Sequence, residues 1–329
     1  MRVLVTGATG FTGGHLARRL AASGREVRIL VRRPEALARS DDGSCTRSFE
    51  VAAGDLRDDA AIARAVQGVD VVYNIAALYR QAGLAREVYR AVNATAVGRL
   101  VEQAAQAGVR RVVHCSTVGV HGDIERPPAD EDAPLRPGDV YQETKLEGER
   151  LARDAARRHG IELTIARPSG IYGPGDRRLL KLFRSAVRRL PILGSGRIYY
   201  HLTYVDDLVE GLRLCGEHPA AANRTYILAG PEVTTLNELT ALIAETAGVR
   251  PPRWHLPVWP VWLAGAVCEG VCAPLGLEPP LFRRRVEFFT KSRAFDITRA
   301  RTEIGYAPAT SLRVGVAWTL DWYRREGWL

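Results

Sequence analysis

Six short runs rich in β-branched residues alternate with helical patterns over the first half of the chain, and this alternation constrains the fold more than any other feature. The runs are RVLVT (2–6), EVRILV (26–31), FEVAAGD (49–55), DVVYNIAA (70–77), RRVVHCS (110–116) and IELTIARP (161–168). The helical patterns between them cover 13–24, 60–68, 96–108 and 145–160. Strands that alternate with helices predict a parallel sheet covered on both faces. Right-handed crossovers then make it a doubly wound α/β fold.

A glycine-rich turn, TGATGFTGG (6–14), follows the first predicted strand and opens the first helix. Gly7 permits a tight turn, Gly10 lets the backbone approach a pyrophosphate, and Gly13 lets the helix pack close to the sheet. The free N–H groups at the start of the helix then face the phosphates. We therefore predict a dinucleotide site here, the alternative being a glycine-rich turn without a ligand. Its predicted residues are Gly7, Thr9, Gly10, Phe11, Thr12 and Gly13.

The end of the second predicted strand bears on which dinucleotide is bound. Enzymes that use NAD usually place an acid here to hold the ribose 2′-hydroxyl, but this chain reads ILVRRP, with Arg32 and Arg33 in that place. An arginine pairs with a 2′-phosphate, whereas a carboxylate would repel it. We therefore favour NADP over NAD. The alternative is that one or both arginines point to water.

A tyrosine and a lysine stand four residues apart in DVYQETKLEGERLA (139–152), at the start of a predicted helix. The chain has 46 basic residues, and only three of them are lysines, so Lys145 stands out. At this spacing Tyr141 and Lys145 project from one helix face. A fixed ammonium is expected to lower the pKa of a nearby phenol, which could then exchange a proton with an alcohol oxygen. We predict that both residues are catalytic and that both also contact the cofactor, with Lys145 able to hold a ribose hydroxyl.

Two hydroxyl side chains, Ser116 and Thr117, follow the fifth predicted strand in HCSTVGVHG (114–122). The carboxyl ends of parallel strands face the cofactor crevice in a doubly wound sheet. One of these hydroxyls can therefore hydrogen-bond the same substrate oxygen as Tyr141. The alternative is that either one is an ordinary turn hydroxyl.

These motifs together resemble those of the extended short-chain dehydrogenases/reductases. The resemblance is carried by TGATGFTG, GDL (54–56), NIAA (74–77), STVGVHG (116–122), YQETK (141–145), RPSGIYGPG (167–175) and YVDDL (204–208). It implies that the catalytic hydroxyl lies five residues before Gly122, which selects Thr117. It also implies cofactor contacts at the adenine, the ribose and the nicotinamide. These contacts are Asp55 and Leu56 at the adenine, Ala76 at the ribose, and the backbone from Pro168 through Gly170 to Ile171 at the nicotinamide.

The resemblance implies a Rossmann-type sheet with a smaller C-terminal substrate domain. We expect residues 1–167 and about 202–230 to form the dinucleotide-binding domain. Residues of about 168–201 and 231–329 would form the substrate-binding domain.

The subfamily is less sharply indicated than the superfamily. Nucleotide-sugar epimerases of this superfamily usually carry an Asn where this chain has Gly170, and an Arg where it has Tyr200. The segment 291–328 is similar to 3β-hydroxysteroid dehydrogenases and their sterol and dihydroflavonol reductase relatives. Three hypotheses follow: a dehydrogenase/reductase for a secondary alcohol or ketone of a largely apolar small molecule, a nucleotide-sugar epimerase or dehydratase, and a non-catalytic regulator that binds NAD(P).

The segment LPVWPVWLAGAVCEGVCAPLGL (256–277) is almost entirely apolar, with Glu269 as its single charge. It is long enough to span a bilayer, but prolines and glycines interrupt it, so we expect one or two short helices and no integral membrane span. With Trp259 and Trp262 it would cover an apolar substrate cleft. The alternatives are core packing, a homodimer face and a peripheral membrane contact. The predicted substrate residues are Tyr79, Thr117, Val118 and Trp262.

Composition argues against several other classes of protein. The formal net charge is 46 − 37 = +9, but the basic residues are dispersed in short clusters, so we expect no nucleic-acid partner. Five scattered cysteines do not form a disulfide framework, and no Cys/His set has zinc spacing, so we expect no metal. The chain opens on a strand rather than a secretory signal, and a reduced cytoplasm fits these features.

Overall fold

A computed structural model describes residues 1–35, 49–81, 83–272 and 290–329, and it contains a sheet of seven parallel strands. The strand order is β10-β6-β5-β4-β1-β2-β3. The strands are β1 (Arg2–Thr6), β2 (Glu26–Val31), β3 (Glu50–Ala53), β4 (Val71–Asn74), β5 (Arg111–Cys115), β6 (Glu162–Pro168) and β10 (Thr225–Leu228). All six predicted runs therefore form strands of one sheet, and β10 adds a seventh.

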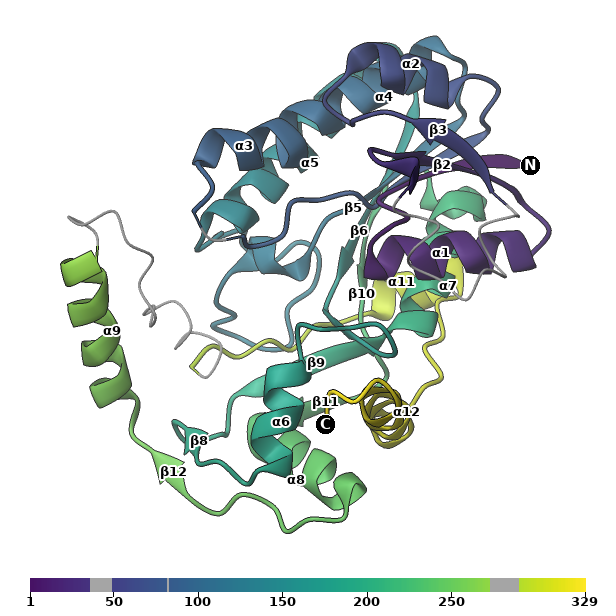
Figure 1. Ribbon diagram of the computed structural model, residues 1–329. Helices are drawn as coiled ribbons and strands as arrows, with labels where there is room; N and C mark the ends of the chain where they lie inside the picture. The colour runs from purple at the N-terminus through teal and green to yellow at the C-terminus, as the bar shows by residue number, and fades with distance from the viewer. Residues whose placement is uncertain (36–48, 82, 273–289) are drawn as a thin grey trace.

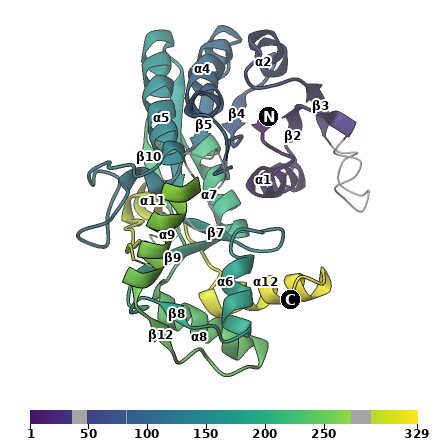
Figure 2. The same cartoon turned by 60° about the vertical axis from the view of Figure 1, so that its left-hand side comes forward.

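Helices cover both faces of this sheet, as the alternation predicts (Figures 1 and 2). One face packs against α1 (Phe11–Ala22) and α7 (Val205–Glu217), and the other against α2 (Asp59–Val66), α4 (Ala96–Gln106) and α5 (Val140–His159). Between α2 and α4 lie α3 (Arg86–Arg90) and a π-helical turn, η3 (Ala91–Thr95), and a 3₁₀ turn, η4 (Val118–His121), follows β5. Each face has its own buried apolar cluster. The predicted doubly wound α/β fold is confirmed.

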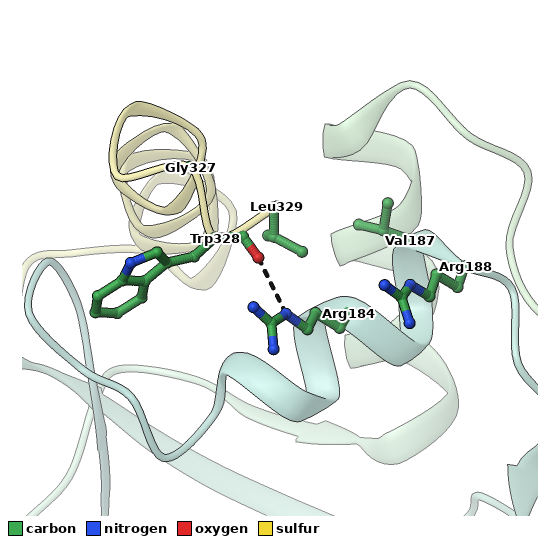
Figure 3. Close-up of a pocket in the computed structure, with 6 residues that line it drawn as sticks. All are labelled: Arg184, Val187, Arg188, Gly327, Trp328 and Leu329. Carbon is green, nitrogen blue, oxygen red and sulfur yellow. Dashed lines mark hydrogen bonds between the residues drawn. The ribbon is translucent and has the colours of Figure 1, made fainter.

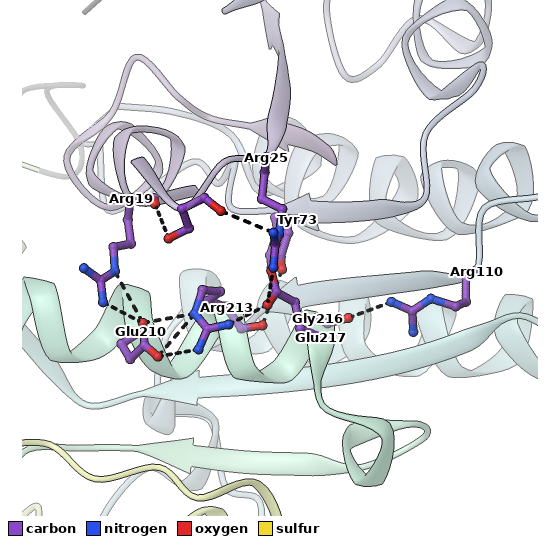
Figure 4. Close-up of polar contacts among 9 residues, drawn as sticks. Arg19, Arg25, Tyr73, Arg110, Glu210, Arg213, Gly216 and Glu217 are labelled. Atoms are coloured by element: carbon purple, nitrogen blue, oxygen red, sulfur yellow. Dashed lines mark hydrogen bonds and ion pairs between the residues drawn. The ribbon is translucent and has the colours of Figure 1, made fainter. Parts of the chain in front are cut away.

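A polar network joins α1 and α7 on the face of the sheet that they cover (Figure 4). Glu210 on α7 accepts from Arg19 on α1 at 3.0 Å, and Glu217 accepts from Arg25 at 2.9 Å. Arg213 lies between the two glutamates and pairs with both. A Cβ on Gly216 would lie 2.1 Å from the Tyr73 hydroxyl, so only glycine lets α7 lie this close to β4.

The rest of the chain forms smaller sheets and their helices. A three-stranded sheet has the order β11-β9-β7, and a two-stranded one pairs β12 with β8. Their strands are β7 (Gly170–Tyr172), β8 (Ile192–Leu193), β9 (Tyr199–Tyr204), β11 (Val233–Thr235) and β12 (His255–Leu256). The helices are α6 (Leu180–Val187), η5 (Pro219–Ala221), α8 (Leu236–Ala247), α9 (Val258–Cys272), α11 (Thr298–Ile304) and α12 (Leu312–Arg325). Strand β9 crosses the predicted boundary at residue 202, and the division into two domains stays a prediction.

The apolar segment forms one helix, α9, over residues 258–272, and its predicted continuation at 273–277 lies outside the described residues. In Figure 1, α9 stands beside the rest of the chain, beyond β12. Trp259 is 69% exposed and Trp262 is 47% exposed, so neither is buried in a core. Within the described ranges, no helix has the length and apolar character that crossing a membrane requires.

Candidate active site

The glycine turn between β1 and α1 is packed so closely that side chains cannot be added. Gly7 has a φ of +72°, and a Cβ there would lie 2.7 Å from the backbone nitrogen of Ala76. A Cβ on Gly13 would lie 2.2 Å from the carbonyl oxygen of Gly7. Gly10 caps α1 without a side-chain hydrogen bond, and no acid occupies the first turn, so the N–H groups of that turn can receive an anion. This cradle fits the pyrophosphate of a dinucleotide.

The start of α1 meets the loop that follows β7. A Cβ on Gly175 would lie 3.1 Å from the Phe11 ring, and the Arg178 guanidinium lies 5.3 Å from the centre of that ring. Arg178 is held by Asp176 at 2.6 Å and by the Ile171 carbonyl at 3.1 Å. The fold thus brings the glycine turn and the predicted nicotinamide segment, 168–171, to one place.

A buried hydroxyl in that segment lacks a partner. Ser169 follows Pro168 directly, is 6% exposed, and its Oγ has no hydrogen-bond partner among the residues that the structure describes. A buried polar group left unpaired is destabilising. The position is therefore suited to a polar group of a bound ligand, and the sequence pattern did not predict this side chain.

The residues predicted for the adenosine half lie at the ends of neighbouring strands, β2 and β3. Arg32 and Arg33 are exposed, and Leu56 is buried. The Asp55 carboxylate accepts two hydrogen bonds from the Arg57 side chain, at 2.9 and 2.8 Å. These bonds hold the pKa of Asp55 below its ordinary value, and the charge of Arg32 acts in the same direction. Arg32 is thus electrostatically coupled to Asp55.

Lys145 joins α5 to the end of β5. Its ammonium is 1% exposed, donates to the Cys115 carbonyl at 2.7 Å, and lies 3.3 Å from Nε2 of His114. Tyr141 lies one turn earlier on the same helix, and Thr117 follows Cys115 by two residues. The Lys145 contact therefore brings all three predicted catalytic residues to the carboxyl edge of the sheet.

The two hydroxyls after β5 point to different partners. Ser116 is buried and donates to Oε1 of Glu149 at 2.5 Å. Thr117 Oγ1 accepts from the Gly119 backbone at 3.0 Å, which leaves its own proton available for donation. A hydroxyl committed to a buried carboxylate cannot also serve a substrate, so this geometry favours Thr117, the residue that the family resemblance implies.

The electrostatic environment of Tyr141 differs from the sequence expectation. Burial raises the pKa of Tyr141 well above its ordinary value, and the positive charges that oppose this shift are those of Arg80 and Arg178. The expected lowering of the phenol pKa by Lys145 is therefore wrong. Burial lowers the pKa of Lys145 itself to about 8. Tyr79, a predicted substrate residue, contacts Tyr141 edge to face at 5.0 Å between ring centres.

Arg80 and Arg178 are each held in place by a buried aspartate. Arg80 donates to Asp139 at 2.7 Å, and its guanidinium lies 5.6 Å from the centre of the Tyr79 ring. Arg178 lies 5.9 Å from the same ring centre. No local spacing links residues 80, 141 and 178, so this cluster could not be predicted from the sequence.

Asn93 is a further residue that sequence reasoning missed. It lies in the π-helical turn η3 and is fully buried. Its Oδ1 accepts from the Leu78 backbone at 2.8 Å, and its Nδ2 donates to Thr144 on α5 at 3.2 Å. It therefore ties the loop that carries Tyr79 to α5, the helix of Tyr141 and Lys145. The sequence signal for Asn93 was a polar residue inside an apolar helical pattern. Its place in a π-turn points the same way, because such turns often mark functional positions.

The remaining predicted substrate residues are less tightly grouped. Val118 is buried in η4 next to Thr117, whereas Trp262 lies on α9.

A separate cavity lies between α6 and the last residues of the chain, where Arg184 donates to the Trp328 carbonyl at 3.0 Å (Figure 3). None of its lining residues is a predicted site residue, so it is not the candidate active site.

The sequence matches the model of the NAD dependent epimerase/dehydratase family over residues 3–229. The chain belongs to this family. Among its characterised relatives is the sterol demethylase protein B of Methylococcus capsulatus, with 30% identity over 99% of both chains. The 3 beta-hydroxysteroid dehydrogenase/Delta 5-->4-isomerase of Mycobacterium tuberculosis is 31% identical over 98% of this chain and 90% of that protein. An Arabidopsis thaliana 3beta-hydroxysteroid-dehydrogenase/decarboxylase is 28% identical over 97% of this chain, which spans 61% of that protein.

Solved structures of other proteins share the fold. The protein gox2253 superposes with a TM-score of 0.82 at 29% identity, over 99% of each chain. MoeE5, solved in complex with UDP-glucose and NAD, superposes with a TM-score of 0.76 at 30% identity, also over 99% of each chain. The likeness to an extended short-chain dehydrogenase/reductase with steroid dehydrogenase relatives is thus confirmed. The relatives include both steroid dehydrogenases and proteins that bind nucleotide sugars.

Proposed function

We propose that this chain is an NAD(P)-dependent oxidoreductase that interconverts a secondary alcohol and a ketone on a largely apolar, steroid-like substrate. The observation that carries the proposal is the contact between Lys145 and the Cys115 carbonyl, which places Tyr141 and Thr117 at one sheet edge. The sterol and steroid relatives, which match nearly the whole chain, support the substrate class.

Thr117 and Tyr141 have different roles in the proposed proton transfer. The Thr117 hydroxyl donates a hydrogen bond to the substrate oxygen, and the Tyr141 phenol gives that oxygen its proton during ketone reduction. Burial raises the pKa of Tyr141, so the phenol is protonated at neutral pH and can act there as the acid in ketone reduction. Alcohol oxidation needs the phenolate, which Arg80 and Arg178 stabilise, so oxidation becomes faster as pH rises. The nicotinamide, when bound, donates or accepts the hydride.

The cradle of Gly7, Gly10 and Gly13 would hold the cofactor pyrophosphate, and Arg32 and Arg33 would pair with a 2′-phosphate. We infer a preference for NADP over NAD on this basis. The pairing of Asp55 with Arg57 supports the inference, because that carboxylate is already neutralised and repels a phosphate less strongly.

A nucleotide-sugar epimerase or dehydratase is the second candidate, favoured by the complex of MoeE5 with UDP-glucose. Two residues weigh against it. A Cβ on Gly170 would lie 2.7 Å from Cδ2 at the end of the Leu202 side chain, so the asparagine of the epimerases would require that side chain to move. Tyr200 is 4% exposed on β9 and offers no arginine charge to a diphosphate. A non-catalytic regulator, the third candidate, would have no use for a proton-transfer set.

Two measurements separate the three candidates. The melting temperature is followed with UDP- and dTDP-sugars and with a 3β-hydroxysteroid, each in the presence of NADP, since a bound ligand stabilises the folded chain. Cofactor reduction is then measured with the 3β-hydroxysteroid. We expect stabilisation and turnover with the steroid only. Stabilisation by the sugars with no effect of the steroid would contradict the proposal.

Tyr141→Phe provides the mechanistic control. It should reduce turnover by about 10²- to 10⁴-fold with cofactor affinity unchanged, because only the proton path is lost. Tyr199→Phe, at an exposed position on β9, should leave turnover unchanged. Activity of Tyr141→Phe within about tenfold of wild type would exclude Tyr141 as the acid/base.

A further inference from the structure

Three polar side chains stand side by side in the apolar interior of the central sheet. Thr6 is in register with Asn74, and Asn74 with His114, so they form one row across β1, β4 and β5. None of the three is more than 1% exposed. The next positions of the row, Leu30 on β2 and Ile165 on β6, are apolar. Central parallel strands are usually apolar throughout, so this polar row needs an explanation.

Hydrogen bonds connect the row to the catalytic lysine. Lys145 Nζ lies 3.3 Å from His114 Nε2, and His114 Nδ1 lies 3.1 Å from the Asn74 amide nitrogen. The Asn74 amide oxygen accepts from Thr6 at 2.7 Å, and Thr6 in turn accepts from the Ala76 backbone at 3.1 Å. The chain of contacts thus runs from Lys145 to the segment predicted to face the cofactor ribose.

The protonation states of these groups constrain one another. Burial and the charge of Lys145 hold the pKa of His114 well below 6.5, so the imidazole is neutral, with one donor and one acceptor nitrogen. An ammonium only donates, so a charged Lys145 requires Nε2 as the acceptor and places the proton on Nδ1. That proton then needs the Asn74 amide oxygen as its acceptor.

A half-turn of the Asn74 amide exchanges its oxygen and nitrogen, and the two orientations correspond to two charge states of Lys145. With the amide nitrogen toward Nδ1, the imidazole proton lies on Nε2, which suits an uncharged amine. With the amide oxygen toward Nδ1, Nε2 is free to accept from the ammonium. The tautomer of His114 is therefore coupled to the charge of Lys145.

We propose that His114 is a positioning residue for Lys145: when the Asn74 amide oxygen faces Nδ1, Nε2 accepts from the Lys145 ammonium and holds that charge at the end of β5. In the structure Thr6 donates to that oxygen and the amide nitrogen faces Nδ1, which is the orientation that suits the uncharged amine, so charging Lys145 requires the amide to turn. The proposal rests on the proposed function only in its activity test, which takes the Lys145 charge to be needed for turnover. His114 itself exchanges no proton with the substrate.

Few other groups act on this ammonium. Burial lowers the pKa of Lys145 to about 8, and the Cys115 thiol and the Glu149 carboxylate act in the opposite direction. Besides Lys145, the positive charge that acts on His114 is that of Arg153 on α5. A lysine balanced in this way titrates close to neutral pH. Loss of one acceptor for its charged form should lower its pKa further.

The composition of the chain allows a direct measurement. Since there are only three lysines, NMR with isotope-labelled lysine can follow the titration of each, and Lys181→Arg and Lys291→Arg identify the Lys145 signal by elimination. We expect His114→Leu to lower the Lys145 midpoint by about one pH unit. His114→Gln should restore most of the shift, because its amide oxygen can accept from Lys145. A wild-type midpoint in His114→Leu would overturn the proposal.

A second measurement needs no substitution at the site. Below the Lys145 midpoint, nitrogen NMR of the wild-type protein should find His114 neutral and protonated on Nδ1, with its signal identified from the His114→Gln spectrum. Protonation on Nε2 below that midpoint would overturn the proposal, and this result stands even if His114→Leu does not fold. Neither experiment uses a substrate. Inactivity on every alcohol would therefore refute the proposed function and leave this inference intact.

In assays of ketone reduction, His114→Leu should lose activity at a lower pH than wild type as pH rises. A uniform decrease at every pH would indicate a structural role only, and would also count against the proposal.

Discussion

Replacing Glu149 by glutamine should destabilise the protein far more than the same change at a neighbouring glutamate. Glu149 on α5 accepts from the Arg167 guanidinium at 3.0 and 2.7 Å and from Ser116 at 2.5 Å. The side chains of Glu149 and Arg167 are 2% and 3% exposed. The other partners of Arg167, a ring nitrogen of His121 and the Glu131 carbonyl, are uncharged. Glu149→Gln therefore leaves a buried guanidinium without a counter-charge.

The size of the effect follows from the burial of this pair. Removing one partner of a buried ion pair costs about 3–5 kcal/mol, and the retained amide oxygen places Glu149→Gln near the lower end, at about 3 kcal/mol. Unfolding entropy of about 2.1 cal/mol/K per residue gives about 0.7 kcal/mol/K for 329 residues. The melting temperature should therefore fall by about 4 °C.

The assay is thermal unfolding of wild type, Glu149→Gln and the control Glu147→Gln. Glu147 lies on the same helix and pairs with Arg90 at 2.7 Å, but both side chains are substantially exposed. An exposed pair contributes about 0–1 kcal/mol, so the control should lose no more than about 1 °C. Equal losses in the two variants would refute the reasoning.

The pH dependence gives a further check on Glu149. Burial alone would raise its pKa, but the hydrogen bonds and charge of Arg167 outweigh burial, so the pKa lies below its ordinary value of 4.5. The stabilisation is then present above pH 4.5 and is lost as pH falls through the pKa of the folded state. Wild type and Glu149→Gln should therefore converge in melting temperature in acid. A constant difference down to the lowest pH at which both fold would contradict this.

Three further predictions concern the site. Thr117→Ala should lower kcat, whereas Ser116→Ala should lower mainly the melting temperature because it removes a donor to Glu149; the reverse pattern would show that Ser116 serves the substrate. Arg32→Asp should shift the ratio of kcat/KM values from NADP toward NAD, and an unchanged ratio would mean that Arg32 points away from the ribose. Trp262→Ala should raise KM for the substrate with cofactor Kd unchanged, and a normal KM would remove Trp262 from the substrate site.

Six of the seven strands of the large sheet could be predicted, because each is a short apolar run next to a helix of clear period, whereas the four-residue strand β10 was not predicted. The small sheets could not. Strands β7 and β11 have three residues each, and β8 and β12 have two, which is too short for a period to show. Their partners also lie far away in the chain, as when β8 pairs with β12. Such strands are defined by tertiary pairing rather than by local pattern.

The same distinction separates the predicted from the unpredicted parts of the site. The glycine turn and the Tyr141–Lys145 pair are local spacings, and they were identified from the sequence. The row of Thr6, Asn74 and His114 depends on strand register, which a single sequence does not specify. Spacing also carries no information on burial. The pKa of Tyr141 was therefore predicted in the wrong direction, although the residue itself was correctly placed beside Lys145 on one helix.

The structure adds a physical reason for lysine at position 145 in a chain with 46 − 3 = 43 arginines. The Lys145 side chain is buried, and its nitrogen has two polar neighbours, the Cys115 carbonyl and His114 Nε2. A compact ammonium with three donors can use both and keep one N–H for a ligand. A guanidinium would bring five donors in a fixed fork and leave several of them unpaired. Arginine is instead found at positions 80 and 178, where partial exposure and an aspartate partner accommodate the larger group. Lysine thus occupies the position where a titratable charge is buried, and arginine the positions where the charge facing Tyr141 stays constant with pH.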